Sequence, residues 1–236
     1  MTAEEKESIY SLLRTSANWV LGYEALGYDA LCFQDDESDE SIEENATAGL
    51  ESIAAKIAQC KNCVLHERRT HTVPGEGVLQ PAVMVIGEGP GEDEDKTGRP
   101  FVGRAGQLLD KMLAAIKLDR TRNCYIANIV KCRPPQNRTP SPQEAEACSG
   151  YLQAQIHLLH PKMILAMGRT AVQNLLQTSQ GINALRGKFF DYNGIPLLAT
   201  YHPSALLRNE DLKRPAWEDL KTFKVKLEEL CPDYAG

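Results

Sequence analysis

Long apolar runs are absent from this 236-residue chain, and no stretch approaches the length of a membrane-spanning helix. The first seven residues, Met-Thr-Ala-Glu-Glu-Lys-Glu, are too acidic for a secretory signal peptide. We therefore expect a soluble, cytoplasmic protein that makes no contact with membranes. A chain of this length can bury one sizeable α/β core and carry an appendage as well.

The chain also lacks an even number of cysteines, since it contains seven. Together with the missing export signal, the odd number argues against a disulfide framework and favours reduced thiols or a metal centre. Cys60 and Cys63 form a Cys-x-x-Cys pair, and Cys132 and Cys148 follow much later in the chain. The other three cysteines are interpreted as structural or incidental thiols: Cys32, Cys124 and Cys231.

The two common nucleotide-binding fingerprints are missing from the most glycine-rich loop. This loop, Gly87-Glu88-Gly89-Pro90-Gly91, follows the apolar run 83–86, but Glu92 stands where a dinucleotide motif needs its third glycine. No Gly-Lys-Ser/Thr follows, so the pattern is a poor match to a phosphate-binding P-loop too. The carboxylates after the loop would repel a pyrophosphate, and they suit a site that positions water or stabilises a cation. With the Phe101 ring close behind them, the pattern indicates a neutral planar ligand.

The net charge of −6 is unevenly distributed along the chain. Residues 1–50 carry 12 acidic and 2 basic residues, whereas residues 51–236 carry 20 acidic and 24 basic residues, a net charge of +4. The main body is therefore mildly basic, which permits contacts with phosphate groups without establishing them.

Apolar runs alternate with helix-like segments after residue 50. Strands are predicted at 83–86, 125–130, 163–167 and 195–201, and helices at 105–116, 170–176 and 215–230. Another helix begins after Ser141, because a serine cap, proline at the first position and Glu144 form a capping box; its second turn would bring Cys148 towards Cys132. The order predicts a three-layer α/β/α fold with a mainly parallel central sheet.

Three parts of the chain are distinguished by composition. Residues 1–33 are predicted to form a helical amino-terminal extension, and residues 34–49 an acidic, flexible linker. Residues 50–236 form the α/β domain, with a short helix from Leu50 leading to Cys60. The acidic extension is also a candidate docking segment for a protein partner or a mimic of nucleic acid.

Four motifs in this order resemble the family 4 uracil-DNA glycosylases, from about Cys60 to Leu230. They are Gly87-Glu88-Gly89-Pro90-Gly91, Thr97-Gly98-Arg99-Pro100-Phe101-Val102-Gly103, Lys131-Cys132-Arg133-Pro134-Pro135 and His202-Pro203-Ser204-Ala205-Leu206-Leu207-Arg208. The resemblance implies a monomeric DNA repair enzyme that flips uracil out of single- or double-stranded DNA and hydrolyses its N-glycosidic bond. It says nothing about residues 1–50.

The resemblance implies a uracil pocket made from three strand ends. Phe101 would stack on the flipped base beside Gly89, and Asn128 would read the uracil edge, since an amide offers both a donor and an acceptor. From sequence alone, Phe101 could equally be a core residue and Asn128 an ordinary turn residue. His202 would donate to uracil O2 and stabilise the departing anion.

The catalytic carboxylate is harder to choose from the sequence. Glu88 is the first candidate for orienting water or stabilising the sugar cation, and Glu94 and Asp95 are second candidates. Either of these two would also be placed to crowd the C5 position and exclude thymine. Glu92 and Asp93 are interpreted as solvated.

The resemblance further implies that residues 204–208 enter the DNA minor groove. One leucine would fill the gap left by the flipped base, with Leu206 preferred and Leu207 the alternative, while Ser204 and Arg208 lie near phosphate. The competing interpretation is that both leucines pack inward in the first turn of a helix.

Four thiolates bind either zinc or iron–sulfur clusters, and spacing does not choose between them. The resemblance implies that Cys60, Cys63, Cys132 and Cys148 ligate a four-iron four-sulfur (4Fe-4S) cluster with a structural role.

Two rival functions share the fold. A covalently trapping uracil-DNA-binding protein would need a histidine within residues 133–142, where there is none. The second rival is a non-catalytic DNA-binding module, which would not need an intact set of site residues: Glu88, Phe101, Asn128 and His202.

Overall fold

The structure, a computed structural model, describes residues 39–235, whose strands form one sheet in the order β1-β3-β2-β4-β6-β5. The strands are β1 (Glu76–Gly77), β2 (Val83–Gly87), β3 (Cys124–Asn128), β4 (Met163–Met167), β5 (Phe189–Tyr192) and β6 (Ile195–Thr200). The four central strands pair in parallel, whereas β1 and β5 are antiparallel edges. The predicted mainly parallel sheet is confirmed.

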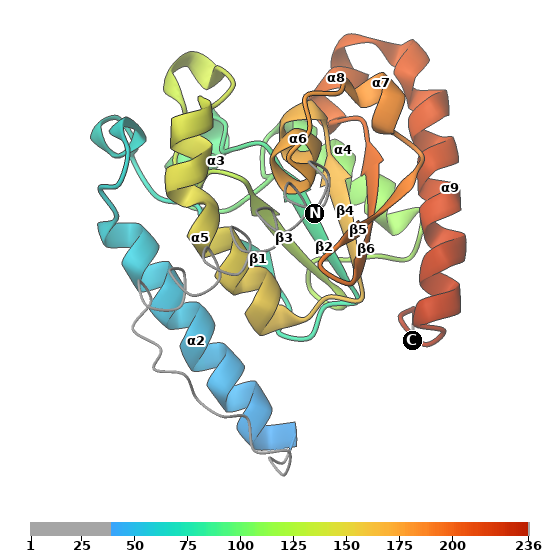
Figure 1. The fold of residues 1–236 in the computed structure, drawn as a ribbon, viewed down its shortest axis with the longest axis horizontal. Coiled ribbons are helices and arrows are strands. Elements are labelled where there is room, and N and C mark those ends of the chain that lie inside the picture. The colour runs from blue at the N-terminus through green and yellow to red at the C-terminus, as the bar shows by residue number, and fades with distance from the viewer. Residues whose placement is uncertain (1–38, 236) are drawn as a thin grey trace, which may run out of the picture.

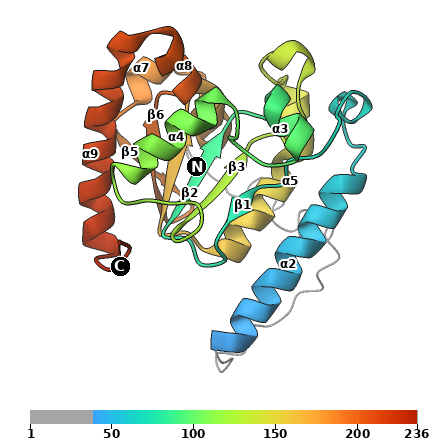
Figure 2. The same cartoon turned by 180° about the vertical axis from the view of Figure 1, so that it is seen from behind.

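Helices cover both faces of the sheet and make three layers. The α-helices are α2 (Asp39–Gln59), α3 (Glu92–Thr97), α4 (Arg104–Ala114), α5 (Pro142–Leu159), α6 (Arg169–Leu176), α7 (Ile182–Leu185), α8 (Pro203–Arg208) and α9 (Lys213–Leu230). Helices α5 and α6 lie over one face (Figure 1), and α4 and α9 over the other (Figure 2). No helix in this part of the chain is long and apolar enough to cross a membrane.

The central strands are apolar throughout because both of their faces are buried. In β2, Met84 and Ile86 pack towards α5 and α6, whereas Val83 and Val85 pack towards α4 and α9. All four side chains are fully buried. This explains why these strands are continuous apolar runs rather than alternating ones, as is usual in parallel sheets.

Helix α2 corrects the expected amino-terminal boundary of the domain. It begins at Asp39, so residues 39–49 are helical rather than a flexible linker. Ile53 and Ile57, one helical turn apart, are buried against α5. Tertiary packing of this kind stabilises a helix whose acidic composition alone suggested a linker. The helical extension predicted for residues 1–33, and residues 34–38 of the linker, lie outside the described part of the chain.

The short elements were the ones that the sequence pattern missed. The two edge strands were not predicted, and neither was α3, whose first turn is residues 92–95. Four acidic residues in that turn are favourable because a helix N-terminus carries partial positive charge. The capping box at Ser141 is confirmed, since the Ser141 side chain accepts from Glu144 N at 3.2 Å.

Candidate functional site

The candidate site lies where the parallel strands end. Gly87 closes β2 and Asn128 closes β3, and the two residues are paired partners in the sheet. Residues following β4 and β6 come to the same edge, because Gly168 N donates to Thr200 O at 2.8 Å. The strand ends that carry the motifs therefore lie at one edge of the sheet, the edge where ligands of open parallel sheets bind.

Gly87 lets two predicted ligand contacts approach each other. A Cβ atom at this position would lie 2.5 Å from Asn128 Oδ1 and 2.5 Å from Phe101 Cζ. A larger residue would not fit at this position. Glycine therefore allows the Asn128 amide and the Phe101 ring to approach each other over the end of β2. At Gly89, a Cβ would lie 2.7 Å from Val130 Cγ2, so the loop backbone packs tightly against β3's continuation.

Asn128 carries an unusual acceptor. The residue is 2% exposed, and its Oδ1 is buried without a hydrogen-bond partner in the described chain. Leaving a buried polar atom unpaired costs roughly 1–3 kcal/mol, so such an atom calls for an explanation. A ligand with an N–H group would supply the missing donor.

Phe101 lies outside the helices and strands, and an unusual backbone conformation sets the position of its ring. Its φ angle is 52°, in the left-handed region that residues other than glycine rarely adopt. The Arg120 guanidinium secures this conformation by donating to Pro100 O at 2.9 Å and to Phe101 O at 3.0 Å. Phe101 is 5% exposed and contacts the core from this position. The Phe101 ring is therefore fixed in place beside Asn128.

His202 is the N-cap of α8, and its neighbours define its tautomer. Nδ1 accepts from Ser204 N at 3.1 Å, so in the neutral ring the proton lies on Nε2. Its ring centroid is 5.5 Å from that of Phe101. Gly168, with φ 89°, leaves room for His202, since a Cβ there would lie 2.8 Å from His202 Cβ. The structure thus presents an N–H donor beside the aromatic ring.

Glu88 and Glu94 have different partners, which separates their roles. Glu88 accepts a short hydrogen bond from Thr170 Oγ1, at the start of α6. Glu94 instead uses both oxygens on backbone groups, accepting from Gly91 N at 3.1 Å and from Val102 N and Gly103 N at 2.9 Å. Glu94 thus connects the glycine loop to the segment after Phe101. Glu88, in contrast, bonds to a side chain, the Thr170 hydroxyl.

Asp95 does not project into the site. It is 3% exposed, and its Oδ1 accepts from Thr70 N at 2.9 Å. The carboxylate therefore accepts from the backbone of a neighbouring segment, which gives it a structural role and argues against the expected contact with a base.

The segment after His202 corrects the preferred groove-filling residue. Leu206 is 2% exposed and packs against Tyr201 and Ala216, whereas Leu207 is 40% exposed. Residues 203–208 form α8, so the side chains of neighbouring residues point about 100° apart around the helix axis. The preference for Leu206 as the inserted side chain is wrong. Arg208 is exposed next to Leu207, and Ser204 is engaged with His202.

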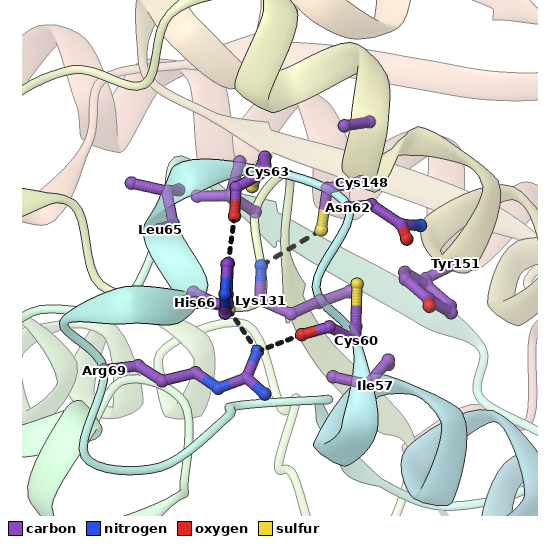
Figure 3. A pocket seen from close by; sticks show the side chains of 13 residues that line it. Ile57, Cys60, Asn62, Cys63, Leu65, His66, Arg69, Lys131, Cys148 and Tyr151 are labelled. Carbon is purple, nitrogen blue, oxygen red and sulfur yellow. Dashed lines mark hydrogen bonds between the residues drawn. The ribbon is translucent and has the colours of Figure 1, made fainter.

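The four cysteines singled out by sequence line one cavity (Figure 3): Cys60, Cys63, Cys132 and Cys148. Two N–H donors point at their sulfurs, since Arg69 NH1 lies 3.3 Å from Cys132 Sγ and Lys131 N lies 3.3 Å from Cys148 Sγ. Such bonds stabilise thiolate sulfur, which is the form that binds metal. The donor set therefore fits a metal–sulfur centre.

The arrangement differs from a site for one small ion. Within residues 39–235, no three His, Cys, Asp or Glu side chains are grouped closely enough to hold a single metal ion. Burial raises the pKa of Cys148 to about 11, and burial also raises the pKa of Cys132. A bound cationic centre would be required to keep these buried thiols deprotonated.

The other three cysteines lie away from this cavity or outside the described residues. Cys124 is buried elsewhere in the core and Cys231 packs at the border of the core, while Cys32 lies outside the described residues.

Sequence reasoning missed several residues that support the site. Thr170 and Gly168 follow β4, and the strand-end rule that found Asn128 could have found them. Arg120 and Arg69 have no local signal, because each acts on a segment far from it along the chain. These contacts became visible only in the three-dimensional structure.

Comparisons with known proteins identify a family that this chain matches. The family described as "Uracil DNA glycosylase superfamily" matches residues 74–221. A type-4 uracil-DNA glycosylase of Thermotoga maritima is 45% identical over 179 residues, which cover 74% of this chain and 93% of that protein. Type-4 enzymes of Sulfurisphaera tokodaii and Archaeoglobus fulgidus are 41% and 40% identical, covering 74% and 77% of this chain and 83% and 93% of those proteins.

Proposed function

The chain belongs to the uracil-DNA glycosylase superfamily and to its type-4 family, and from this we propose that it removes uracil from DNA. It hydrolyses the N-glycosidic bond and leaves an abasic site, the first step of base excision repair. The observation that carries the proposal is the unpaired Oδ1 of Asn128, buried beside the Phe101 ring, which itself lies 5.5 Å from the His202 ring.

Base recognition follows from the chemistry of this pocket. A flipped uracil stacks on Phe101, a contact worth about 1–3 kcal/mol by analogy with single-strand binding proteins. Its N3–H donates to Asn128 Oδ1, and its O4 accepts from the amide nitrogen. Cytosine carries a bare N3 acceptor and an amino group at these positions, so it would leave the Asn128 acceptor unpaired and is rejected.

Cleavage of the glycosidic bond leaves negative charge on uracil and positive charge on the sugar, and the site has one side chain to stabilise each of them. The departing uracil becomes an anion, which His202 Nε2–H stabilises at O2. The sugar becomes cationic, and the Glu88 carboxylate, oriented by Thr170, stabilises it or orients the attacking water. Glu94 shapes the loop that carries Glu88.

His202 acts as a hydrogen-bond donor in its neutral form, so its protonation state should depend on pH in a way that can be measured. Burial, followed by the nearby Arg208 guanidinium, lowers its pKa to about 4. The unfolded chain binds a proton on this residue at a higher pH, so protonation opposes the folded state as the pH falls below about 6.5. We expect the His202 imidazole signal in a carbon NMR titration to stay constant down to about pH 5. A midpoint near the ordinary histidine value would contradict this.

We propose that Leu207, rather than Leu206, fills the gap in the duplex. Leu207→Ala should lower excision from double-stranded DNA about tenfold, part of the few kcal/mol that unstacking costs, with a smaller effect on single strands. Its melting temperature should match wild type. Leu206→Ala is the matched control and should lose about 2–5 kcal/mol of stability, because it empties a buried position. Equal effects on both DNA forms would argue against insertion.

The cavity cysteines hold the cofactor in this proposal. Cys60, Cys63, Cys132 and Cys148 would ligate a four-iron four-sulfur cluster, supported by the two N–H groups that point at their sulfurs. The cluster would cross-link the end of α2, the segment after β3 and α5, and glycosidic hydrolysis requires no electron from it. Arg69 adds to this junction by donating to Cys60 O at 2.9 Å and Ala58 O at 2.7 Å.

Cysteine replacement tests the cofactor assignment. Cys148→Ala should lose bound iron and the visible absorption of the cluster, and its melting temperature should fall. Cys124→Ala is the matched control, because Cys124 is also buried but lies in the other core layer. Iron analysis and an absorption spectrum check both variants. Zinc bound in place of iron would overturn the cluster and leave the glycosylase proposal standing.

The function itself is tested with a labelled oligonucleotide containing one uracil. The purified protein should generate sites that break only after alkali, with many turnovers per molecule. A shifted band that survives denaturation would mean covalent capture, and binding without product would support a non-catalytic module. The monomeric state, and a protein partner for the acidic residues 1–50, remain predictions.

A further inference from the structure

Lys131 is fully buried, with 1% of its surface exposed, although it carries an amino group. Its Nζ donates to Gln155 Oε1 at 2.7 Å and to Asn128 O at 3.1 Å. Burying an amine in the protein interior is costly, and it is tolerated only where the hydrogen bonds are good.

The edge strand explains why Asn128 needs this bond. β1 pairs with β3 only at Tyr125 and Ile126, two residues before Asn128. The chain preceding β1 contains Pro74, which has no N–H to continue the ladder. Gln155 completes the arrangement, because its Nε2 donates to Pro74 O at 2.9 Å. Two side chains, Lys131 and Gln155, thus take the place of sheet hydrogen bonds at the end of β3.

The same residue also reaches the cysteine cavity. Lys131 lines it, and its backbone N–H lies 3.3 Å from Cys148 Sγ (Figure 3). One residue therefore contacts Cys148 through its main chain and the uracil-reading residue through its side chain. Because Gln155 lies two turns beyond Cys148 on α5, the helix that carries a cavity thiol also fixes the lysine.

We infer that Lys131, held by Gln155, is a positioning residue that fixes the main chain of Asn128 so that its unpaired amide oxygen meets the uracil N3–H. The inference rests on the proposed function, since it acts through base reading by Asn128. Removing the lysine bond should let the end of β3 relax, and the amide would then meet the base in poorer geometry.

The test is a double-mutant cycle on single-turnover excision, using Lys131→Met, Asn128→Ala and the double variant. If Lys131 acts through Asn128, Lys131→Met should slow excision about tenfold in the wild-type background and less than about twofold in the Asn128→Ala background. A purely structural role would slow both backgrounds by the same factor. Bound iron and melting temperature, measured on every variant, identify loss of the cluster or fold.

Each outcome decides the inference. Equal slowing in both backgrounds, or no slowing at all, would overturn it while leaving the proposed function intact. An Asn128→Ala rate equal to wild type would remove Asn128 from the proposed function and this inference with it. If Lys131→Met loses iron or does not fold, Gln155→Leu replaces it in the cycle, since it removes the lysine's anchor and leaves the lysine in place, and the same two results apply.

Discussion

Asn128→Ala is expected to lower kcat/KM for uracil excision about 10²-fold, because a bidentate base contact is worth about 1–3 kcal/mol of discrimination. The change removes both the acceptor for uracil N3–H and the donor to O4. The fold should survive, since Oδ1 has no partner within the described chain and its loss breaks no bond there. Steady-state kinetics on a uracil-containing oligonucleotide, with a melting curve, give the measurement.

Asn128→Asp is the matched control for this prediction. It has the size and shape of asparagine and keeps the acceptor for N3–H, but it replaces the donor to O4 with a second acceptor. It should therefore be impaired as well, despite the unchanged volume. Wild-type activity in Asn128→Asp would mean that the pocket selects uracil by shape and not through the amide.

His202→Ala is expected to reduce kcat about 10²- to 10³-fold, the usual effect of removing one donor to a developing anion. KM should change much less, because the donor is needed most in the transition state. The structural basis is the Nε2 proton, which is fixed by the bond from Ser204 N to Nδ1. Single-turnover rates at saturating enzyme separate this effect from DNA binding.

Ser204→Ala is the control for the histidine. It removes the hydroxyl that lies 2.8 Å from His202 Nδ1 but keeps the backbone N–H that sets the tautomer. A modest loss is therefore expected. A His202→Ala variant with wild-type kcat would remove His202 from the chemistry, and the anion would then need another donor.

The layers and the strand ends could be predicted because they depend on local patterns. The central strands are uninterrupted apolar runs, and their ends carry Gly87, Asn128 and the His202 segment. Since parallel strands end at one edge, the order of elements along the chain was enough to bring these residues together. The resemblance to a known family supplied the individual roles of the side chains, which spacing did not determine.

The remaining features depend on contacts between distant residues. Nothing in the local sequence distinguishes Leu206 from Leu207, because their exposure is decided by the rotation of α8 against Tyr201 and Ala216. The position of Phe101 likewise depends on Arg120, 19 residues away. Helix α2, which begins within the expected linker, packs on α5 through Ile53 and Ile57. Such long-range packing overrides local composition.

The central claim is that the unpaired oxygen of Asn128 accepts a hydrogen bond from uracil N3–H. The most direct test compares free uracil with 3-methyluracil, which lacks that proton, as inhibitors of excision by the wild-type protein. The account predicts that uracil inhibits and that 3-methyluracil at the same concentrations does not. Equal inhibition by both bases would contradict it, because the pocket would then bind the ring without using the Asn128 acceptor.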